Sequence, residues 1–190
     1  MNIQNTNASN GASITIQWFD AATGNEVLPA TNDTIPANGR KTYTAPGTTF
    51  KGSAVVSSGE TVVAEVQVIG NSTGISAGYT GGEAGDTTLY IPQILRSAWE
   101  TLVAVQNVGT ANTNVTLTVR DTGGTTVASK TINNVKPNAS AYFDIKNDPE
   151  FSGITKFFES ALVTSSGGVP ILHPVVDQKY RSVEWQCDRE

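Results

Sequence analysis

The chain has 190 residues, a net charge of −5 and a sequence pI near 4.9, and only 15% of its residues are charged. An acidic chain of this kind argues against a nucleic-acid partner, which would select a basic stripe. No window of the sequence approaches the roughly 18 consecutive apolar residues that a membrane-spanning helix needs, so no membrane span is expected.

Alternation of apolar and polar residues predicts strands in the first part of the chain. Residues 14–18 and 62–68 carry an apolar side chain at every second position. Trp18 shares the apolar face of its segment and is therefore expected in the core. Turn signals, such as the Ala-Thr-Gly-Asn run at 22–25, separate the strands. The glycine-rich stretch 78–86 is expected to be a linker.

Strand patterns also fill the second part. Residues 88–95 predict a strand, and Pro92 places it at the edge of a sheet, where one N–H group can be spared. Residues 102–105 are apolar on both faces, as in a central strand, and residues 115–119 alternate. The best helix candidate begins at Pro149 and is expected to form one turn at most.

Segments of the first part recur in the second. The recurring segments are Ile3-Gln4-Asn5 and Val105-Gln106-Asn107, residues 14–20 and 115–121, residues 53–58 and 160–165, and Tyr79 and Tyr180. Repeats about 100 residues apart are whole domains, because solenoid units repeat every 20 to 50 residues or so. The offset grows slightly along the chain, so a few insertions are expected in loops of the second copy.

The duplication and the strand patterns together predict the fold class. We expect an all-β chain with two tandem immunoglobulin-like antiparallel β-sandwich domains, at 1–85 and 86–190, the second ending in the tail 181–190. Each domain would hold about seven strands. Cys187 is the one cysteine and has no internal disulfide partner, so the domains must depend on their hydrophobic cores.

The first copy is expected to lack its opening strand. Residues 88–95 precede the Gln106 of the second copy, whereas only three residues precede the matching Gln4. One edge of the first sandwich would then expose unpaired backbone groups and apolar side chains, which proteins usually cover. Ile3, Gln4 and Asn5 are predicted to border this acceptor edge.

The tail has the alternation of a strand, with Val183 and Trp185 on either side of Glu184. Three interpretations stay open. The chain is a piece of a longer surface protein, with its boundary one strand late. Alternatively, the fold tolerates the loss of the opening strand, or the tail wraps back within its own chain. In the third, the tail of one molecule pairs with the open edge of the next, with Val183 and Trp185 as donor-side anchors. That contact is heterologous and would produce fibres or rings.

The residues that could carry chemistry form no recognisable site. His173 is the lone histidine and lies between apolar residues, and Cys187 lies in the tail, so neither a catalytic triad nor a common zinc site can be built. Asp144, Asp148 and Glu150 could offer oxygen ligands to calcium, but they lack the spacing and turn glycine of a calcium loop. A solvated acidic loop is the better interpretation. No catalytic residue and no cofactor are expected.

Three recurring features carry a resemblance to a family. They are the early Gln-Asn pair, a strand that ends in Asp20 or Asp121 before a glycine turn, and the late Ser-Ala-x-Val strand. Together they resemble the tandem immunoglobulin-like repeats of bacterial secreted and cell-surface proteins, over nearly the whole chain. The resemblance implies a stalk, adhesin or filament subunit and supplies no functional residue. The chain departs from a complete family member in its missing first strand and in having no signal peptide.

These observations predict a non-enzymatic structural subunit or surface repeat module, located outside the cell or on its surface. Its expected partner is itself, as a head-to-tail homopolymer, or the neighbouring repeats of a longer surface protein. The alternative is an adhesin-type module that binds a glycan or a partner protein through the loop tips at one end of a sandwich. An enzyme is the least favoured class.

Overall fold

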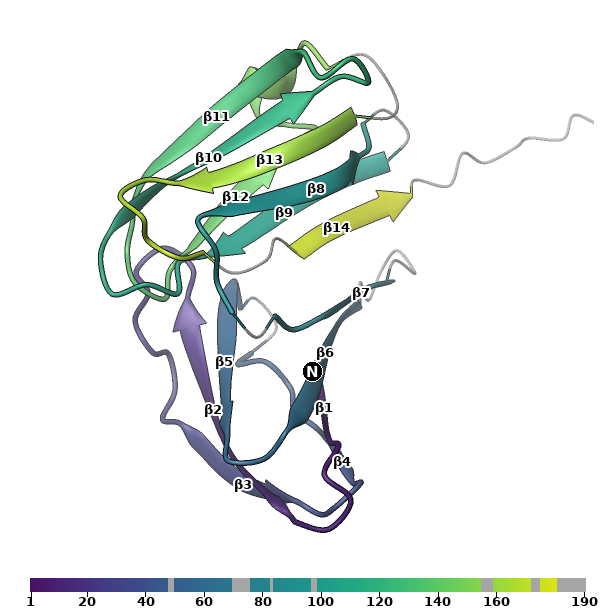
Figure 1. The fold of residues 1–190 in the computed structure, drawn as a ribbon, viewed down its shortest axis with the longest axis vertical. Helices are drawn as coiled ribbons and strands as arrows, with labels where there is room; N and C mark the ends of the chain where they lie inside the picture. Colours follow the sequence, from purple (N-terminus) through teal and green to yellow (C-terminus); the bar gives the residue numbers. More distant parts are fainter. Residues whose placement is uncertain are drawn as a thin grey trace, which may run out of the picture.

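The computed structural model describes residues 1–47, 50–69, 76–82, 84–96, 99–154, 159–171 and 175–180. These residues form an all-β protein with antiparallel sheets, one 3₁₀ turn (η1, Pro149–Phe151) and no α-helix (Figure 1). Nothing in the described ranges forms a helix long and apolar enough to cross a membrane. The all-β prediction is confirmed, and so is the single helical turn at Pro149.

Two open sheets make up the first half of the chain. Its strands are β1 (Asn2–Asn5), β2 (Ala12–Asp20), β3 (Thr31–Ile35), β4 (Arg40–Thr42), β5 (Gly52–Ser58), β6 (Val62–Ile69) and β7 (Ser76–Thr80). They are arranged as a four-stranded sheet in the order β4-β1-β6-β7 and a three-stranded sheet in the order β3-β2-β5. Every described strand pair in both sheets is antiparallel.

The second half also has one four-stranded and one three-stranded sheet, but its fourth strand is added to the other sheet of the pair. Its strands are β8 (Thr88–Ile94), β9 (Trp99–Gln106), β10 (Thr113–Arg120), β11 (Thr126–Val135), β12 (Ser140–Asp144), β13 (Glu159–Ser165) and β14 (Val175–Tyr180). The four-stranded sheet is now β11-β10-β13-β8, and the three-stranded sheet is β12-β9-β14. Strand β8 lies at the edge of its sheet, as Pro92 predicted.

Each half has its own cluster of buried apolar side chains, because alternate residues of its strands point inward. In the first half the fully packed residues are Ile3, Ala12, Ile14, Ile16, Trp18 and Ile35. The Trp18 ring meets Phe50 edge-on, with centroids 5.6 Å apart, which confirms Trp18 as a core residue. The cluster of the second half is larger and includes Phe143 and Phe151.

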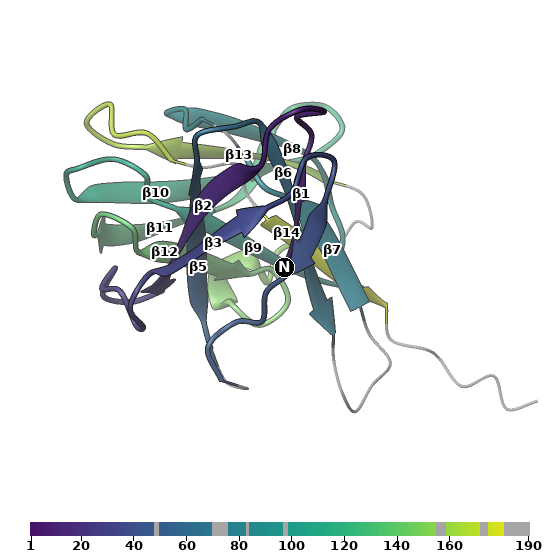
Figure 2. The ribbon, with the colours of Figure 1, turned by 90° about the horizontal axis from the view of Figure 1, so that it is seen from below.

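The two halves are stacked along the long axis of the molecule, and their strands run in different directions (Figures 1 and 2). Direct contacts join them at a junction. The Ser140 N–H donates to the Ala21 carbonyl oxygen at 2.9 Å. The Tyr142 hydroxyl donates to the Gly52 carbonyl at 3.2 Å, and the Lys51 ammonium lies 4.3 Å from the centroid of the Tyr142 ring.

Two details of the sequence interpretation are wrong. The stretch 78–86 is not all linker, because β7 continues through Thr80 and pairs with β6. Tyr180 is not the counterpart of Tyr79. It ends β14, which pairs with β9 as β6 pairs with β1, so β14 takes the place of β6. Tyr79 lies on β7 instead.

Candidate functional site

Strands β5 and β13 hold the same place in the two halves. Val56 of β5 lies opposite Ile16 of β2, and Val163 of β13 lies opposite Leu117 of β10. Ile16 and Leu117 occupy the same position in the recurring segments, so the two registers match. The counterparts on the two strands are therefore Ala54 and Ala161, Val55 and Leu162, Val56 and Val163, and Ser57 and Thr164.

The far edge of this strand differs between the halves. Beyond β13 the sheet continues with β8, which pairs with it along most of its length. Within the residues that the structure describes, β5 pairs with β2 alone and ends its sheet (Figure 1). One side of β5 therefore carries backbone N–H and C=O groups that no described strand pairs with.

Burial reflects this difference in pairing. Val163 lies opposite Leu89 of β8 and is 0% exposed, and Ala161 is also buried. Their counterparts Val56 and Ala54 are only half-buried, although both pack against the core of the first half. The missing neighbour thus leaves apolar surface accessible to solvent on β5.

The facing sheet is incompletely covered in the same region. Val62 and Ala64 of β6 point toward the core of the first half but are also half-buried. We call the free side of β5, together with Ala54, Val56, Val62 and Ala64, the open β5 edge. It offers unpaired main-chain groups beside a strip of apolar side chains, and these are the two features that an added strand uses.

The composition of β5 leaves this edge unprotected. Natural edge strands often carry lysine, other charges or proline, which discourage pairing with another chain. Strand β4 has Arg40 and Lys41, and β8 has Pro92. The seven residues of β5, Gly-Ser-Ala-Val-Val-Ser-Ser, include neither a charge nor a proline.

The residues predicted to border the acceptor edge lie elsewhere. Ile3, Gln4 and Asn5 belong to β1, which has β4 on one side and β6 on the other. Ile3 is a core residue, Asn5 is buried and Gln4 is exposed. The free edge described above belongs to β5, whereas β1 is paired on both sides, so Ile3, Gln4 and Asn5 do not lie along that edge.

Asn5 has a structural role that the sequence argument missed. Its buried side-chain amide donates to the Ile35 carbonyl at 3.1 Å, and its Oδ1 accepts from the Asn7 N–H at 2.9 Å. Asn107 does the same in the second half, donating to the Val135 carbonyl at 2.9 Å. The recurrence of Gln-Asn in the sequence was the signal for this bracing of a strand end.

Several other candidates fall outside the described residues. Val183, Trp185, His173 and Cys187 are among them, so the structure does not place them. Trp99 is described and is the first residue of β9.

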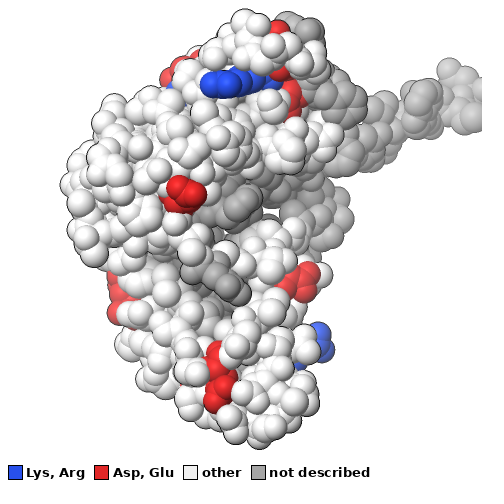
Figure 3. Space-filling view, viewed as in Figure 1, with Lys and Arg blue, Asp and Glu red and all other residues white. Residues whose placement is uncertain are grey.

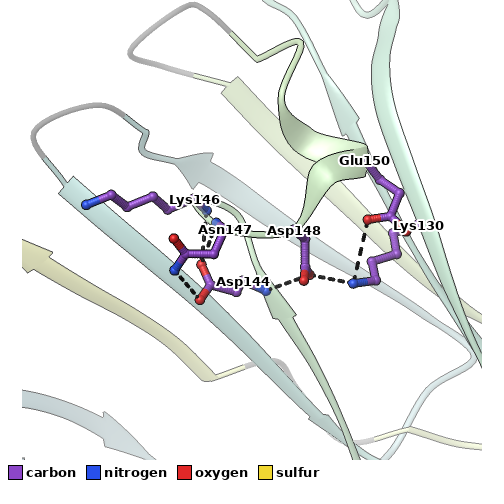
Figure 4. Close-up of polar contacts among 6 residues, drawn as sticks. All are labelled: Lys130, Asp144, Lys146, Asn147, Asp148 and Glu150. Carbon is purple, nitrogen blue, oxygen red and sulfur yellow. Dashed lines mark hydrogen bonds and ion pairs between the residues drawn. The ribbon is translucent and has the colours of Figure 1, made fainter.

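A lysine of β11 pairs with the carboxylates of the acidic loop (Figure 4). The Lys130 ammonium lies 2.8 Å from a carboxylate oxygen of Asp148 and 3.7 Å from one of Glu150. Asp144 accepts a hydrogen bond of 2.8 Å from the Asn147 amide. Burial works to raise the pKa of Asp144, but hydrogen bonds from Asn147 and neighbouring backbone groups outweigh it and lower that pKa. These contacts tie the loop to β11.

Charge elsewhere is sparse. On the face drawn in Figure 3, the described Lys, Arg, Asp and Glu atoms are scattered over both halves without forming a continuous patch. Among the described residues, no group of three or more His, Cys, Asp and Glu side chains is placed to hold a metal ion.

Comparison with known proteins identifies no family. No protein-family profile matches the chain, and no curated protein matches it either. Solved structures with some likeness include the Anabaena sensory rhodopsin transducer, at 16% identity over 53% of this chain and 88% of that one, with a TM-score of 0.38. The VP2 subviral particle of infectious bursal disease virus matches at 12% identity over 94% of this chain and 55% of that one, with a TM-score of 0.32. A Broad Bean Stain Virus structure matches at 10% identity over 96% of this chain and 84% of that one, with a TM-score of 0.25. TM-scores this low support no argument about family or function.

Proposed function

We propose that this chain is a non-enzymatic structural subunit that works outside the cell and assembles with copies of itself. In this proposal its two halves are tandem immunoglobulin-like β-sandwich domains, at 1–85 and 86–190. Subunits join head to tail, because a strand from one copy completes the first sandwich of the next.

The open β5 edge is the observation that carries this proposal. The second half covers the equivalent edge with β8, and the first half has no described strand there. Ala54, Val56, Val62 and Ala64 are left half-buried, and an added strand would bury them and pair the backbone of β5. The absence of charge and proline from β5 fits an edge that is meant to be paired.

The proposed acceptor and donor lie in different halves of the chain. When two copies join through unlike surfaces, the donor of one copy and the acceptor of the other stay free. A further copy can bind at each of them. Such a contact produces a filament, or a ring where the rotation between copies closes. A self-complementary contact would instead stop at a dimer.

A lysine substitution on the open β5 edge tests the proposal. Val55 lies on β5 and faces away from the core, between Ala54 and Val56, so Val55→Lys should leave the fold intact while placing a charge beside any incoming strand. The matched control is Val127→Lys on β11, another edge strand, where Val127 is 37% exposed. We expect sedimentation velocity and electron microscopy to show polymers for wild type and for V127K, and monomers for V55K.

Deletion of residues 181–190 tests the donor side in the same assays. Truncated protein should keep the circular dichroism spectrum of the wild type and lose the polymer. Polymer that survives both V55K and the deletion would refute the proposal. A wild type that stays monomeric and binds a glycan or a partner protein saturably would favour the adhesin-type module instead.

A further inference from the structure

We infer that the strand added to the open β5 edge is residues 182–185 of a second copy, and that it adopts on β5 the register that β8 adopts on β13. The inference rests on the proposed function and specifies its contact residue by residue.

The register follows from the second half. There Leu89 of β8 lies opposite Val163, and Ile91 lies opposite Ala161, so both apolar residues of β8 point into the core. Tyr90 lies between them and is 72% exposed. Transferred to the first half, the added strand needs apolar residues opposite Val56 and Ala54. Between them it needs a residue that tolerates solvent, opposite Val55.

The tail of the chain has this pattern. Ser182-Val183-Glu184-Trp185 repeats the order of residue types in Thr88-Leu89-Tyr90-Ile91: a hydroxyl residue, an apolar one, one with a polar group, and an apolar one. In the transferred register Val183 lies opposite Val56, and Trp185 lies opposite Ala54. Ala54 and Ala64 on the facing sheet are both small and half-buried, so the side chain of an added strand would cover them.

We assign the strand to a second copy because of the direction in which β14 ends and the short segment that follows it. Strand β14 ends at Tyr180, and one residue separates it from Ser182. Two residues span at most about 7 Å when fully extended. In Figures 1 and 2 the arrowhead of β14 points away from β5, so a strand from the same molecule would have to reverse direction within this short segment to pair with β5.

Disulfide trapping between two separate variants tests the inference, with Cys187 replaced by serine in both. One variant carries Val55→Cys and the other Glu184→Cys, which the register places directly opposite each other. Opposite residues on antiparallel strands lie roughly 4.5 to 5.5 Å apart, within reach of a disulfide. We expect the mixed proteins to form a covalent dimer on oxidation, visible on non-reducing gels.

The matched control mixes Val55→Cys with Ser182→Cys. These residues lie on the same face but are displaced diagonally, by roughly 7 to 8 Å, which a disulfide does not span without backbone movement. The in-register mixture should give about tenfold more covalent dimer than the diagonal one, because trapping requires close approach of the two Cβ atoms.

The outcomes separate this inference from the proposed function. Polymer in sedimentation with equal or reversed trapping would overturn the register and leave head-to-tail assembly standing. Absence of both polymer and trapping would overturn both. A chain that carries V55C and E184C together and closes into a cross-linked monomer would show that the tail fills its own edge, which overturns the second copy as donor.

Discussion

Asn5 ends β1 and Asn107 directly follows β9. Each side-chain amide donates to the carbonyl at the end of another strand, Ile35 of β3 and Val135 of β11. The Asn5 amide also donates to the Asn10 carbonyl at 2.8 Å and to the Pro36 carbonyl at 3.1 Å. Asn5 is 0% exposed, so a shortened side chain would leave buried carbonyl groups without donors. A polar residue in a core thus holds the shape of the turn beside it.

Replacing Asn5 by alanine should therefore destabilise the first half. We expect Asn5→Ala to lower the free energy of unfolding by about 2 to 4 kcal/mol, because several buried hydrogen bonds are lost together. The adjacent Gln4 is exposed, and Gln4→Ala should change the same free energy by less than about 0.5 kcal/mol. Urea titrations of both variants measure the difference. Equal effects would contradict the bracing role of Asn5.

A second polar group consists of Asp33 on β3, Lys41 on β4 and Tyr43 directly after β4. The Lys41 ammonium lies 2.7 Å from Asp33 Oδ1, and the Tyr43 hydroxyl donates to Asp33 Oδ2 at 2.9 Å. The hydrogen bond from Lys41, followed by those from the Thr34 N–H and Tyr43, lowers the pKa of Asp33 from 3.8 to about 2. Burial and then the Asp33 carboxylate raise the pKa of Tyr43 from 10.0 to about 12.

Asp33→Asn should lower the pKa of Tyr43 without restoring its ordinary value, because burial, the largest cause, remains. The chain has five tyrosines, so NMR titration with ¹³C-labelled tyrosine is needed to follow this one. A Tyr43 pKa that does not change in D33N would contradict the hydrogen bond.

The same shifts predict the direction of two pH effects on stability. The raised pKa of Tyr43 stabilises the fold below pH 10, and that contribution is lost as the pH rises from about 10 to about 12. The lowered pKa of Asp33 stabilises the fold above about pH 4, and that contribution is lost as the pH falls toward 2. In thermal unfolding experiments, the Tm of the wild type should therefore fall more steeply than the Tm of D33N in both pH windows.

Two equivalent turns differ in what surrounds them. The turn after β2 is capped by Asp20, whose carboxylate accepts from the Thr23 N–H, and the turn after β10 is capped by Asp121, which accepts from the Gly123 N–H. Each turn has a glycine in the left-handed region, Gly24 at φ +69° and Gly124 at φ +82°. A Cβ on Gly24 would overlap the Pro137 carbonyl oxygen across the junction, whereas a Cβ on Gly124 would meet no atom within 4 Å.

Gly24→Ala and Gly124→Ala therefore form a matched pair. Both should cost about 1 kcal/mol of backbone strain, because alanine disfavours a positive φ. Only G24A should also loosen the junction, since Pro137 must move away. Hydrogen exchange at the Ser140 N–H, which donates to Ala21, should accelerate in G24A and stay unchanged in G124A. Similar exchange in both variants would mean that the junction does not depend on this close approach.

At the scale of the whole molecule, the junction between the two halves can be compared with the contact that would join one copy to the next. The cation–π contact of Lys51 with Tyr142 and the hydrogen bond from Tyr142 to Gly52 hold the two halves in one arrangement. The counterpart of Tyr142 on β4 is Thr42, and the counterpart of Gly52 on β13 is Glu159, so an identical junction cannot form between copies. Strand addition at β5 provides a different contact, which is why the proposed filament depends on that edge.

The sequence anticipated much of the architecture, but it did not indicate which strand of the first half ends its sheet beside the core. The recurrence of residues 53–58 as 160–165 predicted two equivalent strands, and their registers agree. The strand at 88–95 without a counterpart predicted an incomplete sheet. Ile3, Gln4 and Asn5 were assigned to its border because they come first in the chain. In the fold, β8 pairs with β13 rather than with β9, so the counterpart edge in the first half, which no described strand covers, belongs to β5.

Local patterns by themselves determined the strands, the turns and the duplication of this protein, because alternation and turn chemistry act between neighbours in the chain. Only the tertiary structure decided which strands lie side by side, since pairing joins segments far apart in sequence. It also decided that Asn5 is buried, that β7 adds a strand to the first half, and that Ala54 and Val56 stay half-covered. The burial of a side chain in the core depends on both sheets together, so no single segment of the sequence determines it.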